Sequence, residues 1–345
     1  MKLKHLLPLI ILFCTPAKAQ RNDTAFYEVH TKNLCVTLLE SRRNYSINIK
    51  SNPYQFLNDT IDIRYKGNTP FTTGICLDYD IFSLAVNFKS VSVDEDTKGL
   101  SEMFAVALGF GGTRYIVETY FSYLKGFYDA NSTYYYKSFK SRGDYYSQPE
   151  LTSQTLKGKF IYVFNDKEFA FKNGCSAIYR QKKSAGSLLV QGNISSSKFS
   201  NNRSLVPDGQ FLDSLIPQVI SLNSLSLAAG GGIAGTWVIG NHFFLNGTLF
   251  ILAEFQKLKA VKETSQNMEA ATNAAFDSRM CFGYNGRNFF ASFSGRAETS
   301  IFRVNGFNMR NSALFFDLSI GYRFDLKDPS FMKQLRKNKL YQAFE

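Results

Sequence analysis

The chain has 345 residues, of which 33 are Phe, 19 are Tyr and only 8 are Pro, and its formal net charge is +12. This length allows two ordinary domains or one long all-β barrel, and the abundance of Phe and Tyr favours strands. Beyond the N-terminus no stretch approaches the roughly 20 apolar residues that a membrane helix needs, so we expect no helical anchor there.

Residues 1–19 have the form of a secretory signal peptide. Two lysines precede a short apolar core, Leu6 to Phe13, and Ala17-Lys18-Ala19 is a small-x-small cleavage site. Cleavage after Ala19 removes three lysines and no acids, so the mature charge is 12 − 3 = +9. Because an exported protein meets little nucleic acid, we expect no nucleic-acid partner. Attraction to outer-membrane lipid and lipopolysaccharide is the functional interpretation of the charge, and plain solubility is the alternative.

Residues 20–33 show no period and are predicted to form a periplasmic or plug segment. Residues 34–51 predict a hairpin that turns at 41–44, and residues 61–66 predict a short strand. From Thr72 onward the alternation is regular and predicts twelve strands, or fourteen if the 34–51 hairpin is added. The twelve cover 72–79, 82–88, 103–110, 114–125, 155–164, 168–180, 184–199, 224–239, 243–255, 271–284, 288–302 and 311–325.

The last of these strands shows the pattern most clearly, because its alternate side chains differ in kind. One set is apolar or aromatic: Leu314, Phe316, Leu318, Ile320, Tyr322 and Phe324. The other set is mostly small or charged: Ala313, Phe315, Asp317, Ser319, Gly321 and Arg323. Successive side chains of a strand point to opposite faces. A soluble two-sheet protein or a strand between lipid and water could both produce this pattern.

Many long two-faced strands behind a signal peptide favour the second interpretation. We therefore predict an all-β fold, an antiparallel transmembrane β-barrel of about 12 strands (10–14 possible) over residues 34–325, followed by a basic C-terminal tail at 326–345. Short turns and long loops alternate as in outer-membrane barrels, but this alternation slips out of phase between Arg180 and Ser221.

The polar faces of the predicted strands carry charges of both signs. In a barrel these side chains would face the lumen, either ion-paired or in water; in a soluble sandwich they would lie outside. The candidates are Asp78, Arg114, Glu118, Glu254, Asp277, Arg279, Arg296, Glu298, Asp317 and Arg323. A second candidate is the basic turn at Arg180, Lys182 and Lys183, which could bind an anionic group or be a solvated turn.

Catalytic patterns are scarce, and we predict that the protein is not an enzyme. The mature chain has two histidines, His30 and His242, and no Ser-His-Asp, H-E-x-x-H or phosphate-binding glycine pattern. No C-x-x-C pair occurs, so neither a metal nor another cofactor is expected. Cys76 and Cys281 fall on the polar faces and could pair, although free thiols are the favoured state.

Five stretches resemble a known family: YKGNTP at 65–70, LKGFY at 124–128, RQKKSAGSLL at 180–189, GTWVI at 235–239 and GYRF at 321–324. On these the chain is similar to the domain-of-unknown-function 4421 family, uncharacterised and mostly Bacteroidota proteins. The resemblance implies an outer-membrane barrel. It implies no activity and no cofactor.

Three functions remain open, in this order. The first is an outer-membrane barrel acting as a narrow channel or a surface scaffold, and its terminal Tyr322 and Phe324 resemble the signal that barrel-assembly machinery recognises. The second is a soluble exported β-protein that binds an apolar ligand. The third is a barrel enzyme acting on lipid or lipopolysaccharide. The solute or protein partner is left open.

Overall fold

The computed structural model describes residues 25–51, 62–91, 93–135, 137–205, 219–262, 266–304, 307–326 and 329–344. The predicted signal peptide at 1–19 lies outside the described residues. Twelve antiparallel strands close on themselves, because the last strand pairs with the first. They are β2 (Asn33–Ser51), β4 (Phe71–Tyr79), β5 (Phe82–Val91), β6 (Glu102–Gly111), β7 (Tyr115–Asp129), β8 (Tyr146–Val163), β10 (Ala185–Ser200), β11 (Val219–Ile239), β12 (Phe243–Lys262), β13 (Gln266–Asn285), β14 (Phe289–Val304) and β15 (Phe307–Asp325). The predicted fold is thus confirmed.

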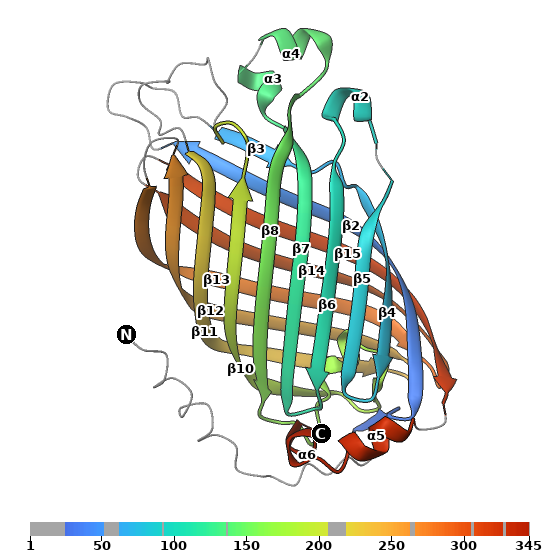
Figure 1. Cartoon of the computed structure of the whole chain (residues 1–345). Coiled ribbons are helices and arrows are strands. Elements are labelled where there is room, and N and C mark those ends of the chain that lie inside the picture. Colours follow the sequence, from blue (N-terminus) through green and yellow to red (C-terminus); the bar gives the residue numbers. More distant parts are fainter. Residues whose placement is uncertain are drawn as a thin grey trace.

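The two ends of the barrel differ (Figure 1). At one end, which we call the turn end, short turns join β4 to β5, β6 to β7, β11 to β12 and β13 to β14. The opposite end, the loop end, carries the small helices α2 (Glu95–Lys98), α3 (Ser132–Tyr135) and α4 (Lys137–Arg142). There β3 (Asp62–Lys66) extends the wall, because it pairs with the upper part of β2 and with the end of β7.

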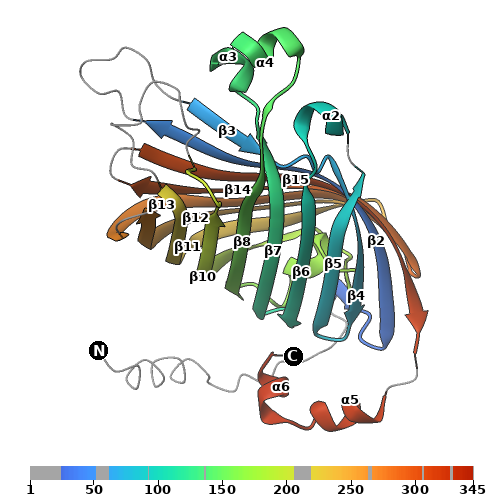
Figure 2. The same ribbon diagram turned by 45° about the horizontal axis from the view of Figure 1, so that its top comes forward.

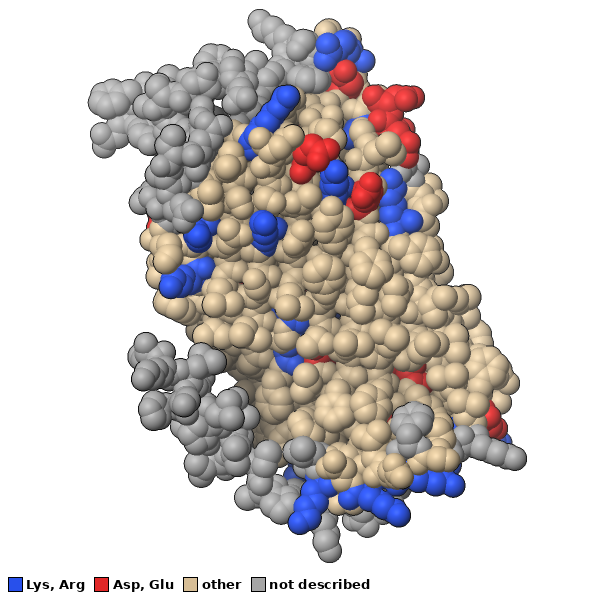
Figure 3. Space-filling view, in the orientation of Figure 1, with Lys and Arg blue, Asp and Glu red and all other residues tan. Residues whose placement is uncertain are grey.

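An apolar belt surrounds the barrel, and β12 shows how it is made. Its outward residues run from Phe243 through Ile251 to Phe255, and most of them, including these three, are exposed. Twelve residue steps of about 3.3 Å, tilted by about 40°, cover about 30 Å along the barrel axis. That height matches the hydrocarbon core of a bilayer. Figure 3 shows the belt as a mostly uncharged band between groups of charged side chains near the two ends.

Polarity reverses where the strands leave the belt. On β12 the outward residues become Lys257 and Lys259, while the inward ones become Leu258 and Ala260, which are buried. On β2 the reversal comes early, since Leu38 is followed on the outer face by Glu40 and Arg42. A strand that meets lipid outside must be apolar outside, whereas beyond the lipid it can place apolar side chains inside and polar ones in water.

This reversal explains why the predicted hairpin at 34–51 is wrong. Residues 33–51 form one continuous strand, and the expected turn at 41–44 lies in its middle. The apolar set is Leu34, Val36 and Leu38 on the outer face but Tyr45, Ile47 and Ile49 on the inner face. The change of face imitates a break between two strands.

The predicted strand at 168–180 is also wrong. Residues 164–184, which we call the plug segment, fold into the bore at the turn end (Figure 2). They form the 3-10 helix η2 (Phe171–Gly174) and β9 (Tyr179–Gln181), which pairs with β1 (Tyr27–Val29). One strand too many here and one too few at β2 leave the total at twelve. Removing the false strand also restores the phase of turns and loops that slipped after Arg180.

Apolar clusters occupy the bore near its two ends. At the loop end, thirteen buried residues from β2, β3, β7, β8, β10, β11, β12 and the 201–205 segment pack together, among them Ile49, Tyr65, Phe127 and Leu258. At the turn end, Phe169 and Phe171 of the plug segment pack on the inner wall against Ile161 and Phe250. Such burial favours the closed arrangement, at about 25 cal/mol per Å² of apolar area.

The C-terminal tail packs beneath the turn end as α5 (Ser330–Leu335) and α6 (Lys339–Phe344). Arg336 binds the buried carboxylate of Asp80 at 2.8 Å, and Met332 and Tyr341 pack on Ile81. No helix in the described part of the chain is long and apolar enough to cross a membrane.

Candidate functional site: a charged bore with a cavity

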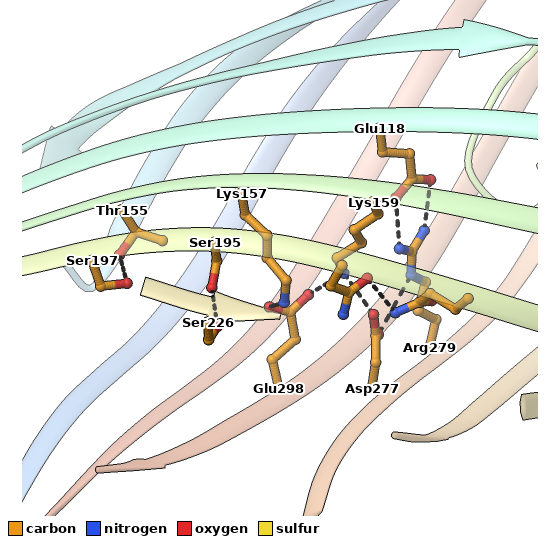
Figure 4. A network of polar contacts seen from close by, with 12 residues as sticks. Glu118, Thr155, Lys157, Lys159, Ser195, Ser197, Ser226, Asp277, Arg279 and Glu298 are labelled. Atoms are coloured by element: carbon orange, nitrogen blue, oxygen red, sulfur yellow. Dashed lines mark hydrogen bonds and ion pairs between the residues drawn. The ribbon is translucent and has the colours of Figure 1, made fainter. Parts of the chain in front are cut away.

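A chain of alternating charges crosses the middle of the bore (Figure 4). Lys157 binds Glu298 at 3.0 Å, and Lys159 binds both Glu298 and Asp277 at 2.6 Å. Arg279 then lies 3.7 Å from Asp277 and donates two hydrogen bonds, of 3.0 and 2.7 Å, to Glu118. Three cations and three carboxylates therefore form one neutral chain, which we call the ion chain.

The ion chain joins opposite walls. Its lysines come from β8 and Glu118 from β7, while its other members come from β13 and β14. In the circle of twelve strands β8 and β14 are five positions apart, close to diametrically opposite. The local reason is strand alternation: Leu156, Gly158 and Phe160 face outward, so the two lysines between them must face inward.

A cavity of about 350 Å³ remains in the bore beside the ion chain. Its wall includes inward side chains of β2, β4, β5, β6, β7, β14 and β15, and its floor includes the plug-segment residues from Phe171 to Ala177. The lining is rich in hydroxyl groups, such as those of Tyr120, Ser294 and Ser319. The cavity can therefore hold a small polar solute or water.

The predicted charged residues occupy several places. Four of them, Glu118, Asp277, Arg279 and Glu298, meet in the ion chain. Asp78, Arg296 and Asp317 line the cavity, and Glu254 is buried facing the bore. Arg114 lies apart, in the turn between β6 and β7, where it binds Asp166 of the plug segment at 3.1 Å.

Arg323 anchors the plug segment. Its guanidinium is 2% exposed and donates to the carbonyl oxygens of Ala177 and Gly286, both at 2.6 Å, and to the side chain of Asn285. It also lies over the ring of Phe290, 5.6 Å from its centroid. A second anchor is Lys172 of the plug segment, whose ammonium donates to the carbonyl of Gly111 at 2.6 Å. Burial lowers the pKa of Lys172 below its usual value.

The predicted basic turn holds the N-terminal segment. Arg180 binds Glu28 of β1 at 3.4 Å and donates to the carbonyl of Asn241 at 2.9 Å. Lys182 and Lys183 have exposed side chains, but their backbone N–H groups donate to the carbonyl of Phe26. The structure thus gives Arg180 a bridging role between β1, β9 and the β11–β12 turn.

Sequence reasoning missed Lys157, Lys159 and Arg43, all of which face the bore. Their strand parity was available as a signal, since each alternates with outward neighbours. Arg43 was hidden because it was placed in the predicted turn at 41–44. The two lysines lie in the predicted strand at 155–164, where alternation with Leu156 and Phe160 indicates that they face inward.

In the part of the chain that the structure describes, the remaining reactive groups form no catalytic arrangement. Cys35, Cys76, Cys175 and Cys281 are free, and the last three line the cavity. His242 lies in the β11–β12 turn, where it stacks on Tyr284 of β13, and it is not beside the inward carboxylates. Within the described residues no group of three or more His, Cys, Asp or Glu could hold a metal ion.

Replacing Lys159 with Met should strongly destabilise the barrel, because Asp277 and Glu298 would lose their shared cation in a buried site. Lys159 and Asp277 are 6% and 2% exposed, and breaking such a pair costs about 3–5 kcal/mol. Urea unfolding of the reconstituted protein measures the change. The control is Ser195→Ala, which removes only a hydroxyl contact with Ser226 and should cost about 1 kcal/mol. Equal stability of Lys159→Met and wild type would mean that the ion chain is not formed.

These features define a class of protein: a closed antiparallel barrel with an apolar belt outside and a charged, internally plugged bore inside. The chain belongs to the family described as "Domain of unknown function (DUF4421)", whose sequence model matches residues 21–324. The predicted family membership is confirmed. No curated protein matches the sequence.

Solved barrels are similar in outline. The outer membrane protease OmpT from Escherichia coli matches with a TM-score of 0.37 and 7% identity over 86% of this chain and 98% of that one. An outer membrane channel from Pseudomonas putida F1 matches with a TM-score of 0.33 and 8% identity, over 88% of this chain and 99% of that one. The P. putida toluene transporter TodX matches with a TM-score of 0.29 and 7% identity, over 86% of this chain and 91% of that one. Likenesses at these scores carry no conclusion about what this chain binds or does.

Proposed function

We propose that this protein is an outer-membrane β-barrel that encloses a closed, solute-sized chamber instead of an open pore. The observation that supports a location in the membrane is the apolar belt of about 30 Å, which ends where polarity reverses on β12. The predicted signal peptide supports export. Short turns face the periplasm in bacterial barrels, so the plug segment and the C-terminal helices would lie on the periplasmic side.

The bore is obstructed at three levels, which supports a closed chamber. The bore of a twelve-stranded barrel is too wide to be filled by wall side chains alone, as in an eight-stranded one, and needs additional material to close it. Here the loop-end cluster, the ion chain and the plug segment supply that material. What remains is the cavity, polar enough to hold a solute.

A gel-mobility experiment tests the location. Unboiled protein from the detergent-extracted membrane fraction should migrate differently from boiled protein, because a closed barrel resists dodecyl sulfate until it is heated. Recovery from the aqueous fraction without detergent, with no mobility shift, would refute an outer-membrane barrel and revive the soluble alternative. That alternative is disfavoured here because it requires the apolar faces to point inward.

Conductance tests the closed chamber. The full-length protein reconstituted in planar bilayers should show no steady ion current at moderate voltage. A stable, ohmic current in wild-type protein would overturn the chamber and support a continuously open channel.

A gated narrow channel is the second candidate, favoured by the hydroxyl-lined cavity wall. It would require the plug segment to move. Brief current steps that vanish when the plug segment is cross-linked to the wall would support it. A lipid-modifying enzyme receives no support from the described residues, because three of the inward carboxylates are held in the ion chain.

A further inference from the structure

Two arginines and an aromatic ring form one row on the cavity wall. Arg43 on β2 pairs in register with Phe315 on β15, which pairs with Arg296 on β14. All three side chains line the cavity. We propose that this row, the arginine row, binds a small oxyanion, a phosphate or carboxylate group, inside the chamber. The proposal rests on the proposed function, since it gives that chamber a ligand class.

Arg43 is held over the cavity, and no carboxylate among the described residues forms an ion pair with it. Its guanidinium lies 5.1 Å from the centroid of the Phe315 ring, so it leans from β2 across β15 toward Arg296. It donates to the hydroxyls of Thr72 at 3.0 Å and Tyr120 at 3.3 Å. A guanidinium has five N–H donors, so three remain for a ligand. The Tyr120 hydroxyl, already accepting from Arg43, can still donate its own proton.

Arg296 has no hydrogen bond and no ion pair with any described residue. The acids of the neighbouring ion chain are already engaged, Glu118 by Arg279 and Glu298 by the two lysines. Asp317, two residues along β15 from Phe315, accepts hydrogen bonds from Ser41 and Ser294. Arg296 therefore faces the cavity without a direct partner among the described residues, and the charges of Glu118 and Glu298 act on it only from beyond ion-pair distance.

Charge in the cavity lining favours an anion. With the neutral ion chain set aside, three cations line the cavity, Arg43, Lys172 and Arg296, against two acids, Asp78 and Asp317, so one positive charge is in excess. Glu254 and Asp277 face the bore but lie outside this lining. The positive excess of the lining therefore comes from residues outside the ion chain.

Geometry also fits one anion between the two arginines. Their Cα atoms are separated by two strand spacings, about 10 Å, and each side chain can reach about half that distance or more. Like charges so placed repel each other in a poorly solvated bore, and an oxyanion between them removes that repulsion. Arginine forks bind carboxylate and phosphate with paired hydrogen bonds. A volume of about 350 Å³ admits a small ligand only.

Calorimetric titration tests the arginine row. The full-length protein in detergent is titrated with inorganic phosphate and, separately, with acetate, which distinguishes the two oxyanion sources. We expect about one anion per barrel, affinity at least tenfold weaker in Arg43→Gln and in Arg296→Gln, and no binding in the double variant. Arg42→Gln is the matched control, because Arg42 is adjacent in sequence but exposed on the outer face, and it should bind as wild type does.

Folding and access are controlled separately. Each variant must keep the heat-dependent gel shift. If wild type shows no binding, the titration is repeated with Arg323→Ala, in which the plug segment is released. Absence of binding there too, or equal binding by the double variant and wild type, would overturn the arginine row. A closed chamber without an anion would still show no current, whereas failure of the chamber would appear as steady conductance whatever the anion does.

Discussion

Replacing Ile251 with Arg should prevent stable assembly of the barrel. Ile251 is 59% exposed in the middle of the apolar belt on β12, with Phe243 and Phe255 toward its two ends. An arginine on the lipid face near the bilayer midplane costs about 2–4 kcal/mol, a large part of the marginal stability of a folded protein. We expect the heat-shifted form on gels to fall at least tenfold in membranes from expressing cells.

The matched control is Val261→Arg. Val261 shares the strand and the outward face with Ile251 but lies beyond Lys257 and Lys259, above the belt. Because an arginine there meets water, assembly should be unchanged. Equal loss in both variants would indicate a general effect of charge on β12, and equal tolerance would place the lipid boundary elsewhere.

Replacing Arg323 with Ala should release the plug segment from the wall. The change leaves the buried carbonyls of Ala177 and Gly286 without their donor, which costs at least about 3 kcal/mol when the lost contacts are combined. The barrel wall itself should persist, because β15 keeps its pairing with β14 and β2. The expected consequence is entry of water and small reagents into the chamber.

The cavity thiols report this opening. Cys76 and Cys175 line the cavity, so a charged methanethiosulfonate reagent should label them at least tenfold faster in Arg323→Ala than in wild type, as followed by mass spectrometry. Arg287→Ala is the control, since Arg287 lies in the β13–β14 turn beside Gly286 and its side chain is exposed. Arg323→Lys should be intermediate, because an ammonium keeps the charge with fewer donors. Rapid labelling of wild-type protein would mean that the plug segment does not seal the chamber.

The ion chain fills part of a wide bore, and it does so with polar groups. An unpaired charge in a poorly hydrated bore is very costly, yet the chain leaves each of its six members with at least one opposite partner. Charges arranged in this way balance one another across the bore, between strands whose order in the closed barrel places them nearly opposite. The arginine row departs from that rule, and this contrast is why it stands out as a binding site.

Strand identity and the facing of side chains followed from the sequence alone. The period of two in residues 311–325 places Leu318 outside and Asp317 inside, because alternation is a local property of extended backbone. The same reasoning predicts the charged character of the bore, whereas the total of twelve strands agrees only because a false strand at 168–180 offsets the missing β2. It fails at 34–51, where the apolar residues change from the outer to the inner face, and at 168–180, where they pack inside the bore, because the pattern alone does not say which surface they cover.

Only the closed tertiary structure decided which inward residues meet. Lys159 and Asp277 are 118 positions apart, and Arg43 and Arg296 are joined through the pairing of the first and last strands. These partners depend on closure, register and tilt, which are set by the whole circle of twelve strands and not by any one segment. The inward folding of the plug segment likewise required a bore wide enough to receive it, a property that exists only once the barrel has closed.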